Sequence, residues 1–441
     1  MNNSDKLQFR RRQFLSMGVR GFGLFAAGGL LGGKFATVAA QQGAAGGVSA
    51  DAAFRSLSGI GELQPPDANG IMLPAGFKSR VVARSGQPPV AGGSYNWHPA
   101  PDGGACFAIP GNWDGIRAQS PFNDGENTGG DDGWIYVSNS EMGLNEGGVG
   151  ALRFNAAGEV VQAYPILENT TVNCAGGATP WGTWLSCEEH ALGQVYECDP
   201  MGKGQAKVRP TLGKFQHEAV AVDMPNHCLY LTEDVDDGAL YRFRAPKPDP
   251  NMLYIVHVGL PYLGQGVLEV AVRENRAGRV YLNWVAVSDP SAATTPTRYQ
   301  VPEYAPFNRG EGIAYHEGAV YFTTTGDNRV WRYDIESSEL EIIYDHAIAS
   351  AASAAPILSG VDNVVLTPAG DVLVCEDGGD MQIVVITPDQ ALIPLLEIPG
   401  HTNSEITGAA FDPTHQRLYF SSQRGITGRS QDGITYEISR A

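Results

Sequence analysis

The sequence predicts an all-β protein, folded as a β-propeller of about six blades around a central metal site. Helical periodicity is scarce after residue 70, whereas short apolar strands interrupted by Gly, Asn and Asp recur along the rest of the chain. The strands also return as a repeated unit at intervals of about 40 to 50 residues, the period of propeller blades. A β-sandwich is the weaker interpretation, because nothing in a sandwich requires equivalent positions at a fixed long period.

The clearest copies of the repeated unit occupy the second half of the chain. Each copy is expected to contain three strands, at 218–222, 229–234 and 238–243; 311–315, 320–325 and 330–333; 362–366, 372–377 and 382–386; and 405–411, 418–422 and 434–438. Two looser copies precede them, at 134–141 with 150–154 and at 184–189 with 194–197. Together these segments account for the predicted blades.

Acidic residues recur at two positions of the unit. The first strand of a blade lines the central channel, so Glu218, Glu311, Asp362 and, in the last copy, Glu405 are expected to converge at one mouth. A second set follows the next strand of each unit: Glu141, Glu188 or Glu189, Glu233 or Asp234, and Asp377. So many neighbouring carboxylates cannot all stay ionised unless cations or protons relieve their repulsion. The alternative is that these acids are solvated at strand ends.

Residues 173–189 combine a thiol, a rigid turn and two carboxylates. Cys174 is followed by glycines and Pro180, and the alternation that begins at Trp184 indicates a strand that ends in Glu188 and Glu189. Crowded carboxylates at a strand end favour a bound cation. A hairpin with a solvated acidic tip is the other interpretation of this stretch.

The N-terminus has the order of a twin-arginine export signal: Arg11-Arg12, then a weakly hydrophobic run, then small residues near Ala40. We therefore expect a signal peptide at 1–40, a flexible segment at 41–66 and a single propeller catalytic domain at 67–441. The apolar run is shorter than the roughly 20 residues of a spanning helix, so no stable membrane anchor is expected. The predicted location is the periplasm or the cell exterior, and the twin-arginine translocase is the predicted partner during export.

Composition narrows the class of partner. The chain of 441 residues has a net charge of −18 and no basic patch, which excludes nucleic acid and favours small-molecule partners. An anionic substrate is compatible with this charge only through bound cations. We expect a monomer. The pairing of the six cysteines stays open: Cys187 and Cys198 are close enough in sequence to bridge one hairpin, and Cys174 competes as a metal ligand.

The residues also resemble a known family, the PhoX-type alkaline phosphatases. The resemblance covers residues 70–441 and rests on the stretch 173–189, followed in the family's order by 215–219, Arg309-Gly310-Glu311, Asp362-Asn363 and 405–408. Members are exported by the twin-arginine route and hold iron and calcium ions at the centre of a β-propeller. This chain is shorter than typical members and has Gly310 where they have proline, so the resemblance leaves substrate preference open.

The resemblance implies roles for individual residues. Cys174 looks like an iron ligand, Arg309 lies beside the phosphate, and the carboxylate ligands are Glu188 or Glu189, Glu218, Glu311, Asp362 and Glu405. Glu141 and Asp377, from the second set of acids, complete the expected metal ligands, and Arg309 and Glu311 are the expected catalytic pair. Carboxylates suit Ca²⁺ and ferric iron, and a thiolate among them favours iron. The alternative for Arg309 is a salt bridge to Glu311 or another acid.

The predicted function is that of a secreted metal-dependent alkaline phosphatase. It would release inorganic phosphate from phosphate monoesters through a metal-bound oxygen nucleophile, with no serine or histidine nucleophile required. A calcium-dependent lactonase-like propeller hydrolase and a non-catalytic, metal-stabilised binding propeller are the alternatives. A lactonase of this kind needs one cation and no thiolate, so Cys174, Arg309 and the surplus of acids favour the phosphatase.

Overall fold

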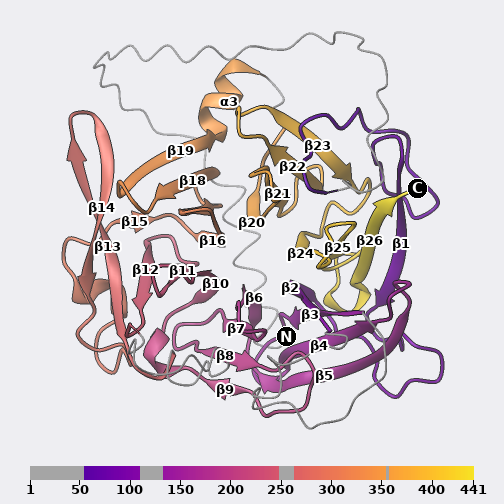
Figure 1. Ribbon diagram of the computed structural model, residues 1–441, viewed down its shortest axis with the longest axis horizontal. Coiled ribbons are helices and arrows are strands. Elements are labelled where there is room, and N and C mark those ends of the chain that lie inside the picture. Colours follow the sequence, from indigo (N-terminus) through magenta and orange to yellow (C-terminus); the bar gives the residue numbers. More distant parts are fainter. Residues whose placement is uncertain (1–53, 110–132, 248–262, 354–356) are drawn as a thin grey trace. The chain divides into compact units, whose positions relative to one another are not determined.

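The computed structural model describes residues 54–109, 133–247, 263–353 and 357–441. All of these belong to one unit that spans Ala50–Ala441. The expected signal peptide at 1–40 and residues 41–53 of the expected flexible segment lie outside the described residues. The described chain is almost entirely β-structure (Figure 1).

Most strands form four-stranded antiparallel groups. Three separate sheets hold one group each, in the order β2-β3-β4-β5, β6-β7-β8-β9 and β20-β21-β22-β23. A ten-stranded sheet contains two more groups, β10–β13 and β16–β19, joined through β14, and β15 pairs with β12 at its side. The last sheet has the order β1-β26-β25-β24. The chain therefore forms six such groups within its described residues.

The strand bounds follow the predicted repeat closely. The first three groups consist of β2 (Pro101–Ala108), β3 (Trp134–Ser140), β4 (Gly147–Phe154) and β5 (Val160–Thr170); β6 (Asn173–Ala178), β7 (Trp184–Glu188), β8 (Val195–Cys198) and β9 (Lys207–Val208); and β10 (His217–Asp223), β11 (Cys228–Glu233), β12 (Gly238–Arg244) and β13 (Val267–Arg276). Between the third and fourth groups lie β14 (Arg279–Ala286) and β15 (Pro306–Phe307).

The remaining groups have the same order. They consist of β16 (Gly310–His316), β17 (Ala319–Thr324), β18 (Arg329–Asp334) and β19 (Glu339–Asp345); β20 (Val361–Leu366), β21 (Val372–Glu376), β22 (Gln382–Ile386) and β23 (Leu392–Glu397); and β24 (Ile406–Phe411), β25 (Arg417–Ser422) and β26 (Ile434–Arg440) with β1 (Phe77–Arg84). Helical structure in the described part comprises α3 (His346–Ala352), the 3-10 turns η3 (Pro210–Leu212), η4 (Thr297–Gln300) and η5 (Ser430–Asp432), and the two residues Leu263 and Gly264. None of these is long and apolar enough to cross a membrane.

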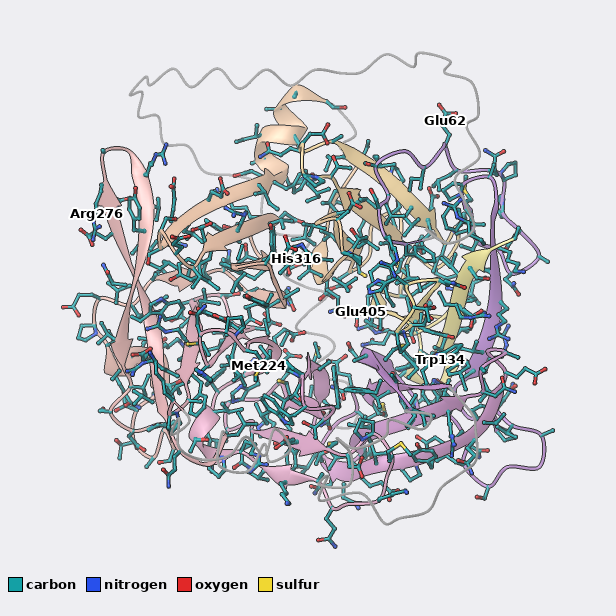
Figure 2. The ribbon with its side chains drawn as sticks, in the orientation of Figure 1. Glu62, Trp134, Met224, Arg276, His316 and Glu405 are labelled. Carbon is teal, nitrogen blue, oxygen red and sulfur yellow. The ribbon has the colours of Figure 1, made fainter. Side chains whose placement is uncertain are left out.

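The groups surround a common centre, and the first strand of each group lies innermost (Figure 1). These inner strands contact one another in a closed order, β2-β6-β10-β16-β20-β24 and back to β2. Glu405 lies near this centre, whereas Arg276, at the tip of the β13–β14 hairpin, lies at the outer edge (Figure 2). The predicted β-propeller is therefore confirmed.

Small residues allow the inner strands to approach closely. A Cβ at Gly312 would lie 2.6 Å from the backbone nitrogen of Val364 in the next group. A Cβ at Gly103 would lie 2.5 Å from Cα of Ala175. Real Cβ atoms do not make such contacts, so glycine is required where neighbouring inner strands converge.

Closure of the ring uses the two ends of the described chain. Strand β1 pairs antiparallel with β26 from Phe77↔Arg440 to Arg84↔Ile434. The pairing covers the edge that β26 would otherwise leave open, and β1 becomes the outermost strand of that sheet. The sequence predicted three strands for each of the four clear copies, and in the last blade the fourth strand comes from the opposite end of the chain.

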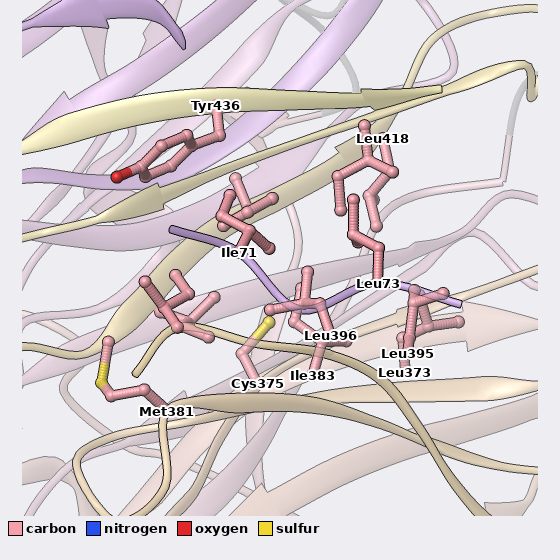
Figure 3. Packing of buried hydrophobic residues seen from close by; sticks show 14 of the residues in the cluster. Ile71, Leu73, Leu373, Cys375, Met381, Ile383, Leu395, Leu396, Leu418 and Tyr436 are labelled. Carbon is pink, nitrogen blue, oxygen red and sulfur yellow. The ribbon is translucent and has the colours of Figure 1, made fainter. Parts of the chain in front are cut away.

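Two side chains of the segment 41–66 pack on the propeller. Phe54 and Leu57 are fully buried in a cluster formed by the β20–β23 sheet and the last sheet. Ile71 and Leu73 extend this cluster, which also contains Leu373 and Leu418 (Figure 3). The Leu57 amide donates a 2.7 Å hydrogen bond to Asp371. Burial of apolar side chains offsets the entropy of ordering this segment.

All six cysteines are free thiols in the structure. Cys187 and Cys198, which the sequence allowed to pair, lie on neighbouring strands but opposite other residues: Cys187 faces Val195, and Cys198 faces Trp184. The question of pairing that the sequence left open is thus answered by the register of β7 and β8.

Candidate metal centre

The first strand of each group presents one side chain at the mouth of the central channel. In five groups the first residue that pairs with the second strand is followed at once by a register shift, and the next residue lies in the shift. A β-bulge re-aims a side chain away from the regular alternation. In the sixth group the shift begins one residue later. We call the residues at this position the first-strand set: Asp102, Cys174, Glu218, Glu311, Asp362 and Thr407.

A second set lies directly after the second strand of each group. Its members are Glu141, Glu189, Asp234, Thr325, Asp377 and Gln423, here called the second-strand set. In all six groups the backbone N–H of this residue donates to the carbonyl two residues before the first-strand set, at 2.8 to 3.2 Å. The repeated hydrogen bond fixes both sets at the same mouth.

The structure distinguishes between the adjacent acids that the sequence could not separate. Glu188 turns away from the centre, where its carboxylate accepts N–H groups from Thr171 at 3.0 Å and Gln194 at 3.2 Å. Glu233 likewise accepts from Ala239 and Tyr241, each at 3.0 Å. Successive residues of a strand point to opposite sides. The structure therefore places Glu189 and Asp234, and neither Glu188 nor Glu233, among the central groups.

Eight carboxylates and one thiol make up four overlapping candidate metal-binding groups. Within each group, one ligand atom per residue lies within 4.8 Å of those of the other members. The groups are Glu141, Cys174 and Glu189; Asp102, Glu141 and Glu405; Glu189, Glu218 and Asp234; and Glu218, Glu311 and Asp362. Because they share members, they form one continuous cluster across the mouth.

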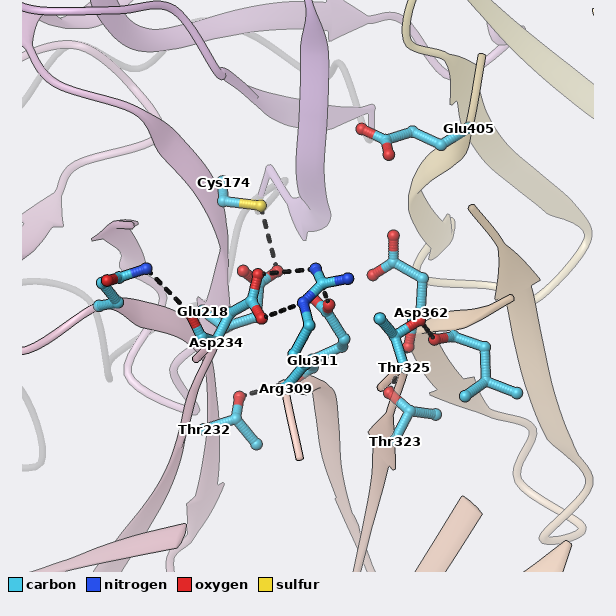
Figure 4. Close-up of polar contacts among 12 residues, drawn as sticks. Cys174, Glu218, Thr232, Asp234, Arg309, Glu311, Thr323, Thr325, Asp362 and Glu405 are labelled. Carbon is cyan, nitrogen blue, oxygen red and sulfur yellow. Dashed lines mark hydrogen bonds and ion pairs between the residues drawn. The ribbon is translucent and has the colours of Figure 1, made fainter. Parts of the chain in front are cut away.

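Of the predicted metal ligands, Cys174 lies in this cluster and Asp377 lies beside it. Cys174 Sγ lies 3.1 Å from Glu218 Oε1 (Figure 4). It also lies 3.8 Å from Asp102 Oδ2, so the thiol contacts two carboxylates of the first-strand set. Asp377 is not in the four groups, but it forms an isolated bridge with Glu405. The predicted residues Glu141, Cys174, Glu189, Glu218, Glu311, Asp362 and Glu405 all lie in the cluster.

Arg309 lies within the acids of the mouth (Figure 4). Its Nε and Nη2 donate to the two oxygens of Asp234 at 2.8 and 2.9 Å, and Nη2 also donates to Glu311 at 2.8 Å. The backbone is held in the left-handed region, with φ of 57°, by hydrogen bonds from Arg309 N to Val235 O and from Thr325 N to Arg309 O, each 2.9 Å long. Such a conformation is costly for a non-glycine residue and is kept only where the surroundings determine it.

The protein alone does not balance the charge of the cluster. Burial, followed by the charges of Glu311, Glu189, Asp362 and Asp234, raises the pKa of Glu218 well above its usual range. Burial and Glu405 raise the pKa of Asp362 to about 7, although Arg309 acts in the opposite direction. Burial and the neighbouring acids also raise the pKa of the Cys174 thiol. A bound cation would reverse each of these effects, since it favours the deprotonated ligand.

The donor set fits metal ions. Glu218 Oε2 is buried and has no hydrogen-bond partner among the residues that the structure describes, and the same is true of Gln423 Oε1. Buried polar atoms normally have partners, and an exception calls for a specific explanation such as an ion. Oxygen donors suit calcium, and the single thiol among them suits iron.

Sequence reasoning missed three residues of this mouth. Asp102 belongs to the first-strand set, but its strand is rich in glycine and lacks the apolar alternation by which we recognised strands. Gln423 donates to Asp102 and to Glu141, the latter at 2.8 Å, and Arg424 donates to Glu405 at 2.9 Å. The sequence did hold a signal for Gln423 and Arg424, since they directly follow the predicted strand 418–422 and acids follow the corresponding strand in other copies.

Fold and cluster together define a β-propeller with an acid- and thiol-lined metal centre. In comparison with known proteins, the family model of alkaline phosphatase PhoX matches residues 132–195 and 189–425 of this chain. The chain belongs to this family, as the resemblance in its sequence predicted. It is accordingly a metal-dependent alkaline phosphatase, a phosphoric monoester hydrolase.

Among solved structures, Pseudomonas fluorescens PhoX in complex with vanadate, a transition state analogue, matches with a TM-score of 0.65. It shares 16% identity over 86% of this chain and 98% of that chain, and thus supports the fold. A nidogen/laminin complex (TM-score 0.40, 10% identity, 66% of this chain and 86% of that one) is a weaker match. So is a regucalcin from Agrobacterium tumefaciens (TM-score 0.31, 16% identity, 60% and 89%). Both matches are too weak to support a structural or functional relationship. No curated protein matches the chain.

Proposed function

We propose that this phosphatase is exported, binds iron and calcium in the central cluster, and hydrolyses phosphate monoesters to inorganic phosphate there. The observation that carries the proposal is the convergence of eight carboxylates and Cys174 at one mouth in a chain of the PhoX family. A net charge of −18 would otherwise repel a phosphate ester, so bound cations are needed to reverse the sign of the potential at the mouth.

We assign the iron ligands to the neighbourhood of Cys174. Its thiol contacts Glu218, whose second oxygen is buried and has no partner within the described part of the chain. Glu311 and Asp362 share a group with Glu218 and are further candidate ligands. The remaining acids, with oxygen as their only donor atom, are suited to calcium; they are Asp102, Glu141, Glu189, Asp234 and Glu405, with Asp377 beside them.

The chemistry that such ions supply when bound is Lewis-acid neutralisation of the phosphoryl oxygens and activation of an oxygen nucleophile. The chain's own contribution is position. Carboxylates on four inner strands, with the Cys174 thiol on a fifth, hold donor atoms in place before substrate arrives, which avoids the cost of reorganising them during the reaction. No histidine or serine nucleophile is required: His217, beside Glu218, is buried and contacts the carbonyl of Gly213.

Arg309 is proposed to bind the phosphate. In the structure its guanidinium joins Asp234 and Glu311, so the salt bridge that the sequence offered as an alternative is present. The guanidinium is planar, and its parallel N–H groups match two phosphoryl oxygens as well as two carboxylate oxygens. Its side chain is 31% exposed, so a substrate in the mouth can reach it.

Location and assembly state follow from the sequence. We propose export by the twin-arginine translocase through the signal at 1–40, so that the protein acts in the periplasm or outside the cell as a monomer, with 67–441 as its catalytic domain. The twin-arginine route carries folded proteins, which would allow metal loading before export.

The test combines elemental analysis of the purified protein with hydrolysis of p-nitrophenyl phosphate across alkaline pH. Iron and calcium should both be present, and Cys174→Ala should lose iron and activity together. Cys228→Ala is the matched control, because Cys228 is also a buried thiol but lies at the opposite end of β11 from the mouth. Calcium without iron, and no phosphate release after reconstitution with iron, would contradict the proposal.

A further inference from the structure

A second arginine reaches the mouth from the last group of strands. Arg424 directly follows Gln423 of the second-strand set, and its guanidinium donates to Glu405 Oε1 at 2.9 Å. Glu405 belongs to one of the candidate metal-binding groups. The side chain of Arg424 is 20% exposed. It is therefore reachable from solvent, although its partner carboxylate is buried.

The backbone around Arg424 is held firmly by buried polar groups. Arg424 N donates to Ser404 Oγ at 2.9 Å, and Ser404 Oγ lies 2.9 Å from Ser422 Oγ. Ser422 Oγ in turn lies 2.8 Å from His401 Nδ1. Side chains that bind or position substrate are most effective when such a supporting shell fixes them.

Arg424 and Arg309 belong to different groups and pair with different acids of the mouth, Glu405 and Glu311. Asp362 lies between Arg309 and Glu405 (Figure 4). Arg309 belongs to the β16–β19 group, Asp362 to β20–β23, and Arg424 with Glu405 to the last group. Consistent with this arrangement, the pKa of Asp362 is raised by burial and by Glu405 and is lowered by Arg309.

We propose that Arg424 is a second phosphate-binding arginine, which donates to a phosphoryl oxygen of the monoester from its place beside Glu405. This inference rests on the proposed function. A phosphoryl group presents three non-bridging oxygens, and one arginine can pair with two of them. Arginine has five N–H donors, so Arg424 can keep its contact with Glu405 while another N–H holds a phosphoryl oxygen.

The test is steady-state kinetics of Arg424→Gln and Arg424→Lys in the metal-loaded protein, with inorganic phosphate as competitive inhibitor. Loss of a charge-assisted hydrogen bond to phosphate should raise KM for p-nitrophenyl phosphate and Ki for inorganic phosphate about 10- to 100-fold. Arg424→Lys should recover part of the loss, and kcat should change less than KM. Arg279→Gln is the control, because Arg279 pairs with Glu339 on the exposed outer strands.

Metal content and melting temperature separate substrate binding from support of Glu405. We expect iron and calcium stoichiometry and melting temperature to match the wild type in both variants. An unchanged Ki in an active Arg424→Gln protein would overturn this inference alone, as would a Ki that returns to the wild-type value at saturating calcium. A fully loaded wild type that releases no phosphate would overturn the proposed function, and this inference with it.

Discussion

Replacement of Asp362 by asparagine should stabilise the metal-free protein at alkaline pH. The carboxylate is 8% exposed, and burial together with Glu405 raises its pKa from 3.8 to about 7. Asparagine keeps the shape, and its side-chain oxygen can still accept from Asn363, which lies 2.9 Å from Asp362 Oδ1. The backbone carbonyl of Asp362, which accepts a hydrogen bond from the Thr323 hydroxyl, is unaffected.

The size of the stabilisation follows from the linkage between proton binding and folding. The pKa is higher in the folded state, so the folded protein binds more protons than the unfolded chain between pH 3.8 and about 7. The stability of the metal-free wild type therefore falls as pH rises through this window, and the full cost of the ionised carboxylate is present above it. A shift of roughly three units at about 1.4 kcal/mol each sets an upper limit of about 4 kcal/mol for the stabilisation by asparagine.

Urea denaturation of chelator-treated protein at pH 5 and pH 8 measures this effect. We expect the asparagine variant to gain stability over the wild type at pH 8, to gain less at pH 5, and to lose stability relative to wild type once metals are restored. Asp199→Asn is the control, because Asp199 lies outside the mouth and accepts N–H groups from Met201 and Lys203. Equal stability of Asp362→Asn and wild type at pH 8 without metal would refute the reasoning.

Three further changes have definite expected outcomes. Thr232→Val should lower the free energy of unfolding by about 1–2 kcal/mol in urea denaturation, because the hydroxyl donates to the Glu311 carbonyl of the next group at 2.5 Å. A loss below roughly 0.3 kcal/mol, the error of the measurement, would contradict this. Phe54→Ala should cost about 3–5 kcal/mol in the same assay, since the ring is fully buried, and unchanged stability would mean that residues 54–66 do not pack as described. Glu188→Gln should leave metal content intact but destabilise the β7–β8 turn, whereas Glu189→Gln should lower metal content in elemental analysis, and the opposite result would reverse our assignment of these neighbours.

Local patterns predicted much of this protein. The repeat of strands predicted the propeller, and the recurrence of acids after corresponding strands predicted that they would meet. Glu218, Glu311, Asp362 and Glu405 do share the mouth with Cys174. These predictions succeeded because equivalent positions of a repeated unit are brought to equivalent places around a central axis.

Tertiary structure decided which of two adjacent acids faces the centre. Glu188 and Glu189 have the same chemistry. The position of the bulge and the pairing of β6 with β7 direct Glu189, and not Glu188, to the mouth. The same holds for Glu233 and Asp234. A shift of one residue moves a side chain to the opposite side, so composition and spacing could not separate them.

Contacts between distant segments were also beyond the sequence. Strand β1 completes the sheet of β26, and Gln423 donates to Glu141, which lies far away in the chain. The sequence by itself determined the repeated strands, the kinds of donor atom and the family. The folded ring determined which donors meet, because ligand distances depend on how six groups of strands pack around one centre and no single segment carries that information.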